Sequence, residues 1–261
     1  MSTQRIHPTA IVHADAQLGK NVTIGPFCQI HANVTLGDHT TVESHCELGY
    51  STPLAKRPAL DIGAGSLIRS HSIFYSGSSF GDGLVTGHRV TVRENTIAGP
   101  NLHLGTLCDI QGDCVFGAYC RLHSNVHVGK HSTVGNFVWI FPYTVLTNDP
   151  TPPSETRLGV TLEEYSVIAT HSVLLPGVTI GQHALVGAGS VVSQDIPART
   201  LATGNPARVI RPVDEIRDRA SGKPMYPWPR QFQRGYPERI IQKWRHEFNE
   251  QHATWHDCEE D

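Results

Sequence analysis

Histidine is the residue type in this sequence best suited to acid–base chemistry, and the chain contains 16 histidines among 261 residues. Two of them stand out by position: His88 in "GLVTGHRVTVREN" and His123 in "RLHSNVHVG". An imidazole changes charge near neutral pH, so a positioned histidine can take a proton from an attacking amine or hydroxyl. His88 is the favoured general base and His123 the second candidate. The alternative for each is an ordinary solvated histidine at a turn or an edge.

Cysteine is the second residue type whose spacing suggests chemistry. Cys108, Cys114 and Cys120 follow one another at intervals of six residues. A zinc site, a series of disulfides or a purely structural period would each explain such spacing. The choice depends on whether the rest of the chain has the same period.

A six-residue period runs through most of the chain. Every sixth residue from Ile6 to Leu48 is aliphatic, the pattern shifts by two residues and resumes from Ile62 to Leu146, and it returns from Ile168 to Val192. Glycine follows this first position of the hexad fourteen times, and the fifth position is small or apolar. Such a repeat is typical of a parallel β-helix with three hexads per coil, and the 28 hexads predict about nine coils. We expect the glycines to accommodate strained backbone at the corners.

The period also explains the cysteines. Five of the six cysteines occupy the fifth position of a hexad, where a small hydrophobic side chain should point inward. We therefore expect neither a zinc site nor disulfides from them, and this usage fits a reducing compartment. One residue breaks the apolar rule of the first position: Thr86 is polar, and local exceptions of this kind tend to mark functional positions.

Two interruptions and a tail complete the organisation. The proline-rich segments 50–61 and 147–161 are out of phase and are predicted to be loops on one face of the solenoid that carry function. The predicted β-helix domain covers residues 1–197, and residues 198–261 form an extended exit segment followed by an extension with an amphipathic helix within 236–251. The stretch 220–237 allows no assignment.

Overall charge and hydropathy exclude several classes of protein. The net charge of −3 and the isoelectric point near 6.6 give no electrostatic footprint for nucleic acid or an anionic membrane. No apolar run approaches the roughly 20 residues of a membrane span, and the first ten residues lack the apolar core of a signal peptide. The sequence therefore predicts a cytoplasmic protein.

The repeat over residues 6–196 resembles the left-handed β-helix acyltransferases, and the resemblance implies the left hand. "TGNPARVIRP" is similar to the exit sequence of coenzyme-A-dependent members, while "FPYTVLTNDPTPPS" and "GLVTGHRVTVREN" resemble segments of enzymes that N-acylate nucleotide-linked amino sugars. The resemblance implies acetyl transfer from acetyl-coenzyme A, without a metal, to an amino group of a nucleotide-linked deoxyamino sugar for surface polysaccharide or O-antigen synthesis. It also implies a homotrimer with sites between subunits.

Further site residues follow from the resemblance. Sugar-binding candidates are Arg89, Glu94, Asn148 and Asp149, although the Asn-Asp-Pro sequence also favours a simple turn. Coenzyme-binding candidates are Gly187, Ala188, Asn205, Arg208 and Arg211, with exposed tail charges as the alternative for the two arginines.

Two other functions remain open from the sequence. One is O-acetylation of a sugar or small alcohol, which needs a base more strictly because an alcohol is a poorer nucleophile than an amine. The other is a zinc carbonic anhydrase, with His88, His123 and His127 at roughly suitable spacing.

Overall fold

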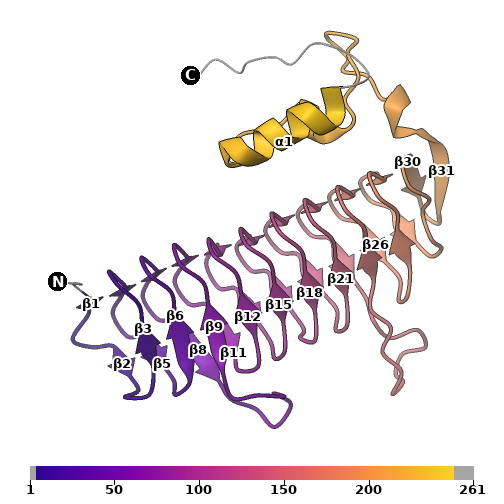
Figure 1. The fold of residues 1–261 in the computed structure, drawn as a ribbon. Helices are drawn as coiled ribbons and strands as arrows, with labels where there is room; N and C mark the ends of the chain where they lie inside the picture. Colours follow the sequence, from indigo (N-terminus) through magenta and orange to yellow (C-terminus); the bar gives the residue numbers. More distant parts are fainter. Residues whose placement is uncertain (1–3, 250–261) are drawn as a thin grey trace.

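The computed structural model describes residues 4–249, and these fold into a long solenoid of very short strands with an extension at its C-terminal end (Figure 1). Three parallel sheets run the length of the solenoid, with twelve, ten and nine strands. The predicted parallel β-helix is confirmed. It has ten to eleven coils rather than nine, partly because β24 is a further hexad after the second interruption and partly because β30 continues one sheet.

The strands fall into the sheets as every third element of the chain. Sheet A contains β1 (Arg5–Ile6), β4 (Thr23–Ile24), β7 (Thr41–Val42), β10 (Leu67–Ile68), β13 (Val85–Thr86), β16 (His103–Leu104), β19 (Arg121–Leu122), β22 (Trp139–Ile140), β25 (Val167–Ile168), β28 (Leu185–Val186), β30 (Thr200–Gly204) and the antiparallel β31 (Ala207–Pro212). Sheet B contains β2 (Ile11–Val12), β5 (Gln29–Ile30), β8 (Glu47–Tyr50), β11 (Ile73–Tyr75), β14 (Thr91–Val92), β17 (Asp109–Ile110), β20 (His127–Val128), β23 (Val145–Leu146), β26 (Val173–Leu174) and β29 (Val191–Val192). Sheet C contains β3 (Gln17–Leu18), β6 (Val34–Leu36), β9 (Leu60–Ile62), β12 (Ser79–Phe80), β15 (Ile97–Ala98), β18 (Val115–Phe116), β21 (Thr133–Val134), β24 (Thr161–Leu162) and β27 (Thr179–Ile180).

The coil length of 18 residues sets the register of all three sheets. In sheet B, for example, Thr91 pairs with Asp109, and Asp109 pairs with His127. Side chains 18 residues apart therefore lie one above the other at about the 4.8 Å spacing of paired strands. We name the corners by the sheets they join: the A–B corner follows a strand of sheet A, and the B–C and C–A corners follow in turn.

The interior contains the residues that the period predicted. First-position side chains such as Ile24, Ile110 and Ile180 are at most 1% exposed, and the fifth-position cysteines lie buried beside them. Cys28, Cys46, Cys108, Cys114 and Cys120 are free thiols. Burial raises the pKa of Cys108 and Cys114 to about 11, so both thiols are protonated at neutral pH. At the N-terminal end Ile6 is 41% exposed, because β1 pairs on one side only.

The expectation that the glycines accommodate strained backbone at the corners is wrong. Among the fourteen glycines that follow a first position, only Gly49 has a positive φ. The others are needed for space: a Cβ on Gly37 would lie 2.4 Å from the backbone nitrogen of Ala64 in the next coil. The left-handed conformation falls two residues further on, at positions such as Asn21, His39 and His71. Since asparagine and histidine tolerate this region better than most residues, six of the sixteen histidines are explained by corner geometry.

Two glycine substitutions separate space from conformation. Gly37→Ala should destabilise the fold by about 1–3 kcal/mol, because the added methyl group overlaps the neighbouring coil although φ is ordinary. Gly65→Asn should cost less than about 1 kcal/mol, because φ is +65° but nothing lies within 4 Å of its Cβ position. Urea unfolding of both variants checks the order, and a more stable Gly37→Ala would contradict it.

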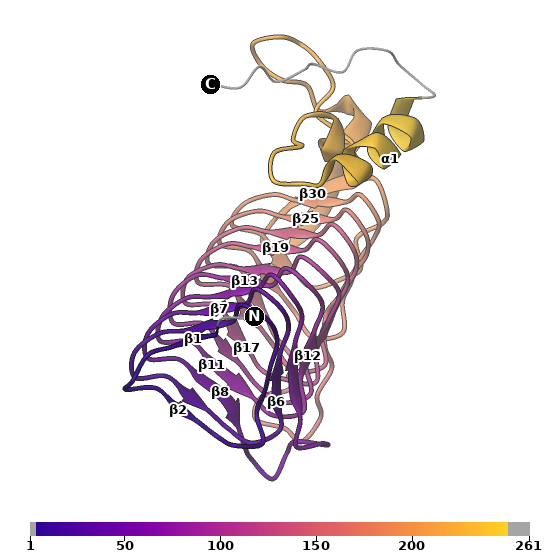
Figure 2. The same ribbon diagram turned by 60° about the vertical axis from the view of Figure 1, so that its left-hand side comes forward.

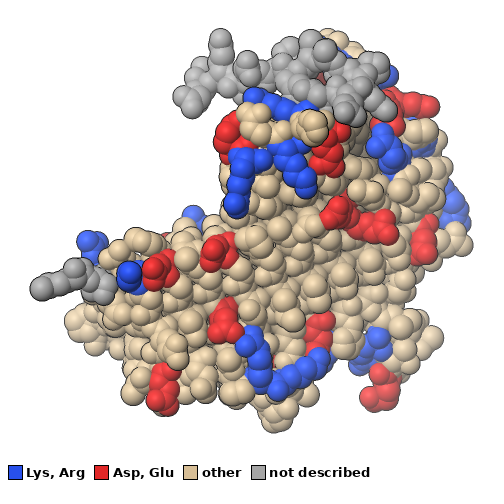
Figure 3. Space-filling model, in the orientation of Figure 1, with Lys and Arg blue, Asp and Glu red and all other residues tan. Residues whose placement is uncertain are grey.

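Both inserted loops leave the solenoid at the B–C corner, as predicted for interruptions that gather on one face. The first connects β8 to β9 and the second connects β23 to β24. Thr161 was expected to end the second loop, but it is the first residue of β24. Figure 1 shows the loops projecting on the same side of the molecule. Figure 3 shows few charged side chains along the middle of the face that carries sheet C, whereas charged residues gather near the first loop and around the C-terminal extension.

The C-terminal extension covers the C–A corner of the middle coils. It contains the short 3₁₀ helices Val213–Glu215 and Trp228–Arg230 and the helix α1 (Glu238–Asn249), within the range predicted for a helix; residues 250 and 251 lie outside the described residues. Figure 2 shows the extension alongside one side of the stacked coils. No helix among the described residues combines the length and apolar character required to cross a membrane.

An aromatic ladder on the solenoid holds the extension in place. The ladder consists of the left-handed corner residues Tyr119, Phe137, Tyr165 and His183, whose rings stack at centroid distances of 5.3, 4.9 and 4.7 Å. Buried aromatic residues of the extension pack against it: Trp228, Tyr236 and Trp244. The stretch 220–237, which the sequence left unassigned, thus supplies part of this second core.

The ladder should make the fold sensitive to acid. Burial, followed by the charge of Arg199, lowers the pKa of His183 from 6.5 to about 4. The unfolded chain therefore binds this proton more readily than the folded protein, and the stability present above pH 6.5 declines as the pH falls towards 4. The melting temperature of His183→Asn should fall less steeply than that of the wild type between pH 7 and 4.5. Equal slopes would show that His183 does not contribute.

Candidate functional site

A groove of about 490 Å³ runs over the outer face of sheet A beside the extension. Gly87 and Gly105 of the A–B corner are among the residues that line it. His103 and His123 line the middle of the groove, and Phe232 of the extension lies at one end. Its volume lies in the range of small-molecule sites.

Thr86, the polar exception in the repeat, is fully buried and alters the sheet beside this groove. The backbone N–H of Arg69 donates to the Thr86 hydroxyl at 2.8 Å, whereas the corresponding N–H of Glu43, one coil earlier, donates to the carbonyl of Ile68. The carbonyl oxygen of Thr86 accepts a hydrogen bond from the Arg69 guanidinium at 2.7 Å instead. The threonine therefore fixes the arginine side chain at the wall of the groove.

His88 lies on the A–B corner next to the groove, and its ring is oriented by two neighbours. Its Nδ1 is 2.8 Å from Ser70 Oγ and 3.9 Å from a carboxylate oxygen of Glu43. The side chain is 52% exposed, so the ring is accessible to substrate. The backbone N–H of His88 donates to the hydroxyl of Thr106, which lines the groove. An accessible imidazole beside a carboxylate is well arranged for general-base chemistry.

His123 lies in the groove but is less suited to proton transfer. Its ring stacks on Phe141 at 4.7 Å, and its Nε2 is buried without a hydrogen-bond partner. Burial lowers the pKa of His123, so the ring is neutral at physiological pH. This arrangement indicates a lining role.

A second oriented histidine, His127, was considered from the sequence only as a possible zinc ligand. His127 Nδ1 lies 3.0 Å from Asp109 Oδ2, and Gln111 donates to the same carboxylate oxygen at 2.7 Å. The hydrogen bond with His127 is the main cause of the lowered pKa of Asp109. The signal was available, because the two residues are 18 apart and occupy the same position in consecutive coils.

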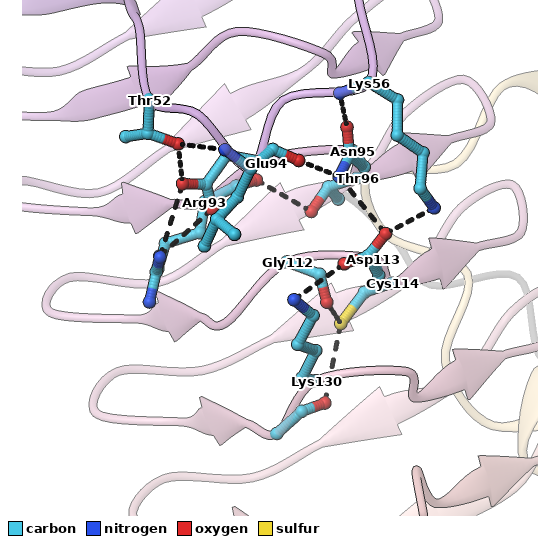
Figure 4. Close-up of polar contacts among 12 residues, drawn as sticks. Thr52, Lys56, Arg93, Glu94, Asn95, Thr96, Gly112, Asp113, Cys114 and Lys130 are labelled. Atoms are coloured by element: carbon cyan, nitrogen blue, oxygen red, sulfur yellow. Dashed lines mark hydrogen bonds and ion pairs between the residues drawn. The ribbon is translucent and has the colours of Figure 1, made fainter. Parts of the chain in front are cut away.

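Glu94 and the first loop form a closed network at the B–C corner (Figure 4). Glu94 is 2% exposed and accepts hydrogen bonds from Thr52 of the loop and from Arg93. Burial opposes its ionisation, but these hydrogen bonds prevail and lower its pKa. Glu94 thus secures the loop in this structure, while Arg89 is exposed at the A–B corner.

Asp113 fastens the same loop from the next coil. Its carboxylate is 9% exposed and pairs with Lys56 of the loop at 2.6 Å and with Lys130 at 3.0 Å (Figure 4). Burial opposes ionisation of Asp113, but the two lysines outweigh it and hold the pKa below its usual range.

Removing the Asp113 charge should loosen the loop. Asp113→Asn is expected to speed tryptic cleavage after Lys56 about fivefold, corresponding to about 1 kcal/mol for an ion pair. The control is Asp15→Asn, whose side chain is 74% exposed. Cleavage rates measured by mass spectrometry test this expectation. Equal rates in Asp113→Asn and Asp15→Asn would contradict the anchoring role of Asp113.

The second loop is organised by Asp149. Its carboxylate accepts hydrogen bonds from the backbone N–H of Thr151 and Ser154, from the Ser154 hydroxyl and from Arg157. The backbone carbonyl of Asn148 accepts from Leu158 across the base of the loop. The turn interpretation of Asp149 therefore has direct support here, and the Asn148 side chain is half-buried beside it.

The coenzyme candidates divide between the last coil and the hairpin that follows. Gly187 and Ala188 lie on the A–B corner between β28 and β29, where a Cβ on Gly187 would lie 2.8 Å from the Thr203 hydroxyl. Asn205 is in the exposed turn between β30 and β31, and Arg208 and Arg211 are exposed on β31.

The structure therefore places five of the eleven candidates along one edge. His88, Arg89, His123, Gly187 and Ala188 all belong to the A–B corner, and His88 is five coils, or roughly 24 Å, from Ala188. Glu94, Asn148 and Asp149 belong to the B–C corner, on the other side of sheet B. Among residues 4–249, no three His, Cys, Asp or Glu side chains form a group that could hold a metal ion, and the suggested set of His88, His123 and His127 is not assembled.

Comparisons with known proteins agree with this architecture. Residues 15–50 match the family model described as bacterial transferase hexapeptide (six repeats). The six-residue repeat of the sequence extends well beyond this matched segment, over residues 6–196. A likeness to a solved structure of an Arabidopsis UDP-N-acetylglucosamine acyltransferase has a TM-score of 0.63, with 21% identity over 79% of this chain and 74% of that one, and supports the fold.

Two curated relatives of this hexapeptide-repeat protein are acetyltransferases. It is 38% identical over 86 residues to a 2,3,4,5-tetrahydropyridine-2,6-dicarboxylate N-acetyltransferase of Staphylococcus aureus, covering 33% of this chain and 35% of the relative. It is 35% identical over 119 residues to a galactoside O-acetyltransferase of Escherichia coli, covering 37% and 59%. The chain thus spans about a third and three fifths of these relatives, and the resemblance to β-helix acyltransferases expected from the sequence is confirmed.

Proposed function

We propose that this hexapeptide-repeat protein transfers an acetyl group from acetyl-coenzyme A to an amino group of a nucleotide-linked deoxyamino sugar, in surface polysaccharide or O-antigen synthesis. The observation that carries the proposal is the accessible, oriented imidazole of His88 at the edge of the groove. The two acetyltransferase relatives support acetyl transfer, although one acts on an amine and the other on a hydroxyl by their names.

The chemistry follows from the position of His88. The amine nitrogen attacks the thioester carbonyl carbon, the new C–N bond forms, and the C–S bond breaks to release the coenzyme thiolate. The proton lost by nitrogen passes to His88 Nε2, because Nδ1 is already engaged with Ser70. Glu43, 3.9 Å from the ring, stabilises the imidazolium, and the released proton finally neutralises the thiolate.

The donor is proposed to lie along the A–B corner towards Gly187 and Ala188. Backbone groups of the last coils would meet its amide-containing arm, and the exposed Arg208 and Arg211 would meet its phosphates. Asn205 lies in the same hairpin. The proposal also includes a cytoplasmic location and a homotrimer with sites between subunits. We further propose that the sugar is bound by Arg89, Glu94, Asn148 and Asp149. His123 is proposed to line the site.

His88→Asn tests the proposal. Release of free thiol from acetyl-coenzyme A, measured with a panel of nucleotide-linked amino sugars, should fall about 10²–10⁴-fold in kcat with little change in coenzyme affinity. The acidic limb of the wild-type pH–rate profile should disappear. His39→Asn is the matched control, because this exposed corner histidine accepts asparagine in its left-handed conformation.

A second variant identifies the base if His88 is not it. A loss of less than about tenfold in His88→Asn, with an unchanged pH profile, would remove His88 from proton transfer. A large loss in His127→Asn would then assign the base to the pair of His127 and Asp109. Absence of thiol release by the wild type with every acceptor, alcohols included, would overturn the proposed function itself.

A further inference from the structure

Three arginines converge on the groove without carboxylate partners. Arg69 and Arg121 come from sheet A, and Arg234 comes from the extension. Within residues 4–249 none of the three forms an ion pair with Asp or Glu, whereas six other Arg or Lys residues do. No Asp or Glu among the described residues lines the groove. The groove is therefore cationic, with no internal charge to neutralise it.

Arg121 is the clearest sign of a missing counter-charge. It is only 9% exposed, and its guanidinium donates to the backbone carbonyls of Asn101 and Gly235 at 2.6 and 3.4 Å. Its guanidinium carbon also lies 4.8 Å from the ring centre of Tyr236. A guanidinium buried against carbonyls and an aromatic face is held in position but keeps its full positive charge.

The environment of His103 shows that the positive charges act on the same space. Burial, followed by the charges of Arg121 and Arg69, lowers the pKa of His103 to about 4. The ring between the two arginines is therefore neutral at physiological pH and offers hydrogen bonds rather than charge. Arg69 is fixed by Thr86 as described, at the cost of one regular sheet hydrogen bond.

The end of the groove beyond the arginines is aromatic. Trp139 lies 5.2 Å from Phe232 in an edge-on arrangement, its indole N–H donates to Tyr236 at 2.9 Å, and Phe232 is 38% exposed. An exposed ring beside fixed guanidinium groups suits a ligand that combines a planar heterocycle with neighbouring phosphates, because bases stack on aromatic side chains and arginines bind phosphate in pairs of hydrogen bonds.

We infer that the groove between sheet A and the C-terminal extension binds a nucleoside diphosphate group through Arg69, Arg121 and Arg234, with Phe232 stacking on the base. Thr86 is a positioning residue that acts through Arg69. This inference deepens the proposed function, since both of its substrates, the nucleotide-linked sugar and coenzyme A, contain such a group.

Calorimetric titration with uridine diphosphate and with coenzyme A tests the site. Arg234→Ala should weaken binding of one of the two about tenfold or more, the loss expected for a charged hydrogen bond. Arg219→Ala, an exposed arginine outside the groove, is the matched control and should change neither affinity. A loss confined to uridine diphosphate assigns the groove to the sugar nucleotide, and a loss confined to coenzyme A assigns it to the donor.

Thr86→Val separates positioning from stability. Valine restores the apolar residue of the repeat and allows the regular sheet hydrogen bond to form, so the melting temperature should not fall. The affinity affected by Arg234→Ala should nevertheless decrease about threefold to tenfold, because Arg69 loses its fixed orientation. Unchanged affinities for both ligands in Thr86→Val and Arg234→Ala would overturn the inference.

Thiol release measured in parallel distinguishes this inference from the proposed function. If Thr86→Val and Arg234→Ala both catalyse acetyl transfer with unaltered KM values, the proposed function holds but the groove does not bind either substrate. If uridine diphosphate binds in an arginine-dependent way but no acceptor is acetylated, the nucleoside diphosphate site is supported and the proposed acetyl transfer is contradicted.

Discussion

Stacking of identical coils at the distance of paired β-strands is the constraint on which the rest of this molecule depends. It forces a period of 18 residues, so that each position meets its own equivalent above and below. It also explains the glycines, because at Gly37 the backbone of the next coil occupies the space that a side chain would need. The histidine-rich composition follows in part from the left-handed residues that the corners require.

The residues that could take part in binding or catalysis lie mainly where this period is interrupted. Thr86 replaces an aliphatic residue and exchanges a sheet hydrogen bond for a fixed arginine. The two loops insert at one corner, and the first is tied down by Glu94 and Asp113. At the C–A corner the left-handed residues become aromatic and receive the extension. A regular scaffold thus gives each exception a defined place relative to the others.

The fold was predictable from the sequence because a strict period translates directly into position. The buried cysteines, the common side of the loops and the position of Thr86 as an exception to the apolar pattern all follow from counting residues. The pairing of Asp109 with His127 also follows from the 18-residue coil length. To find it, one has to compare the side chains that point out of the solenoid as well as those of the core. The docking of residues 228–244 was not predictable, because its contacts with Tyr165 and Arg121 have no period and depend on side-chain shape. The burial of Glu94 likewise depends on how a proline-rich loop folds back.

The attachment of the extension to the aromatic ladder has a consequence for how the molecule is made. The groove wall from Arg69 to Trp139 belongs to coils that precede Phe232 by between 93 (232 − 139) and 163 (232 − 69) residues in the chain. Since synthesis proceeds from the N-terminus, the solenoid can stack coil by coil while the groove remains without its outer side. The groove is completed only after residues 232–234 have also left the ribosome. A nascent chain therefore has a finished scaffold before it has a finished binding surface.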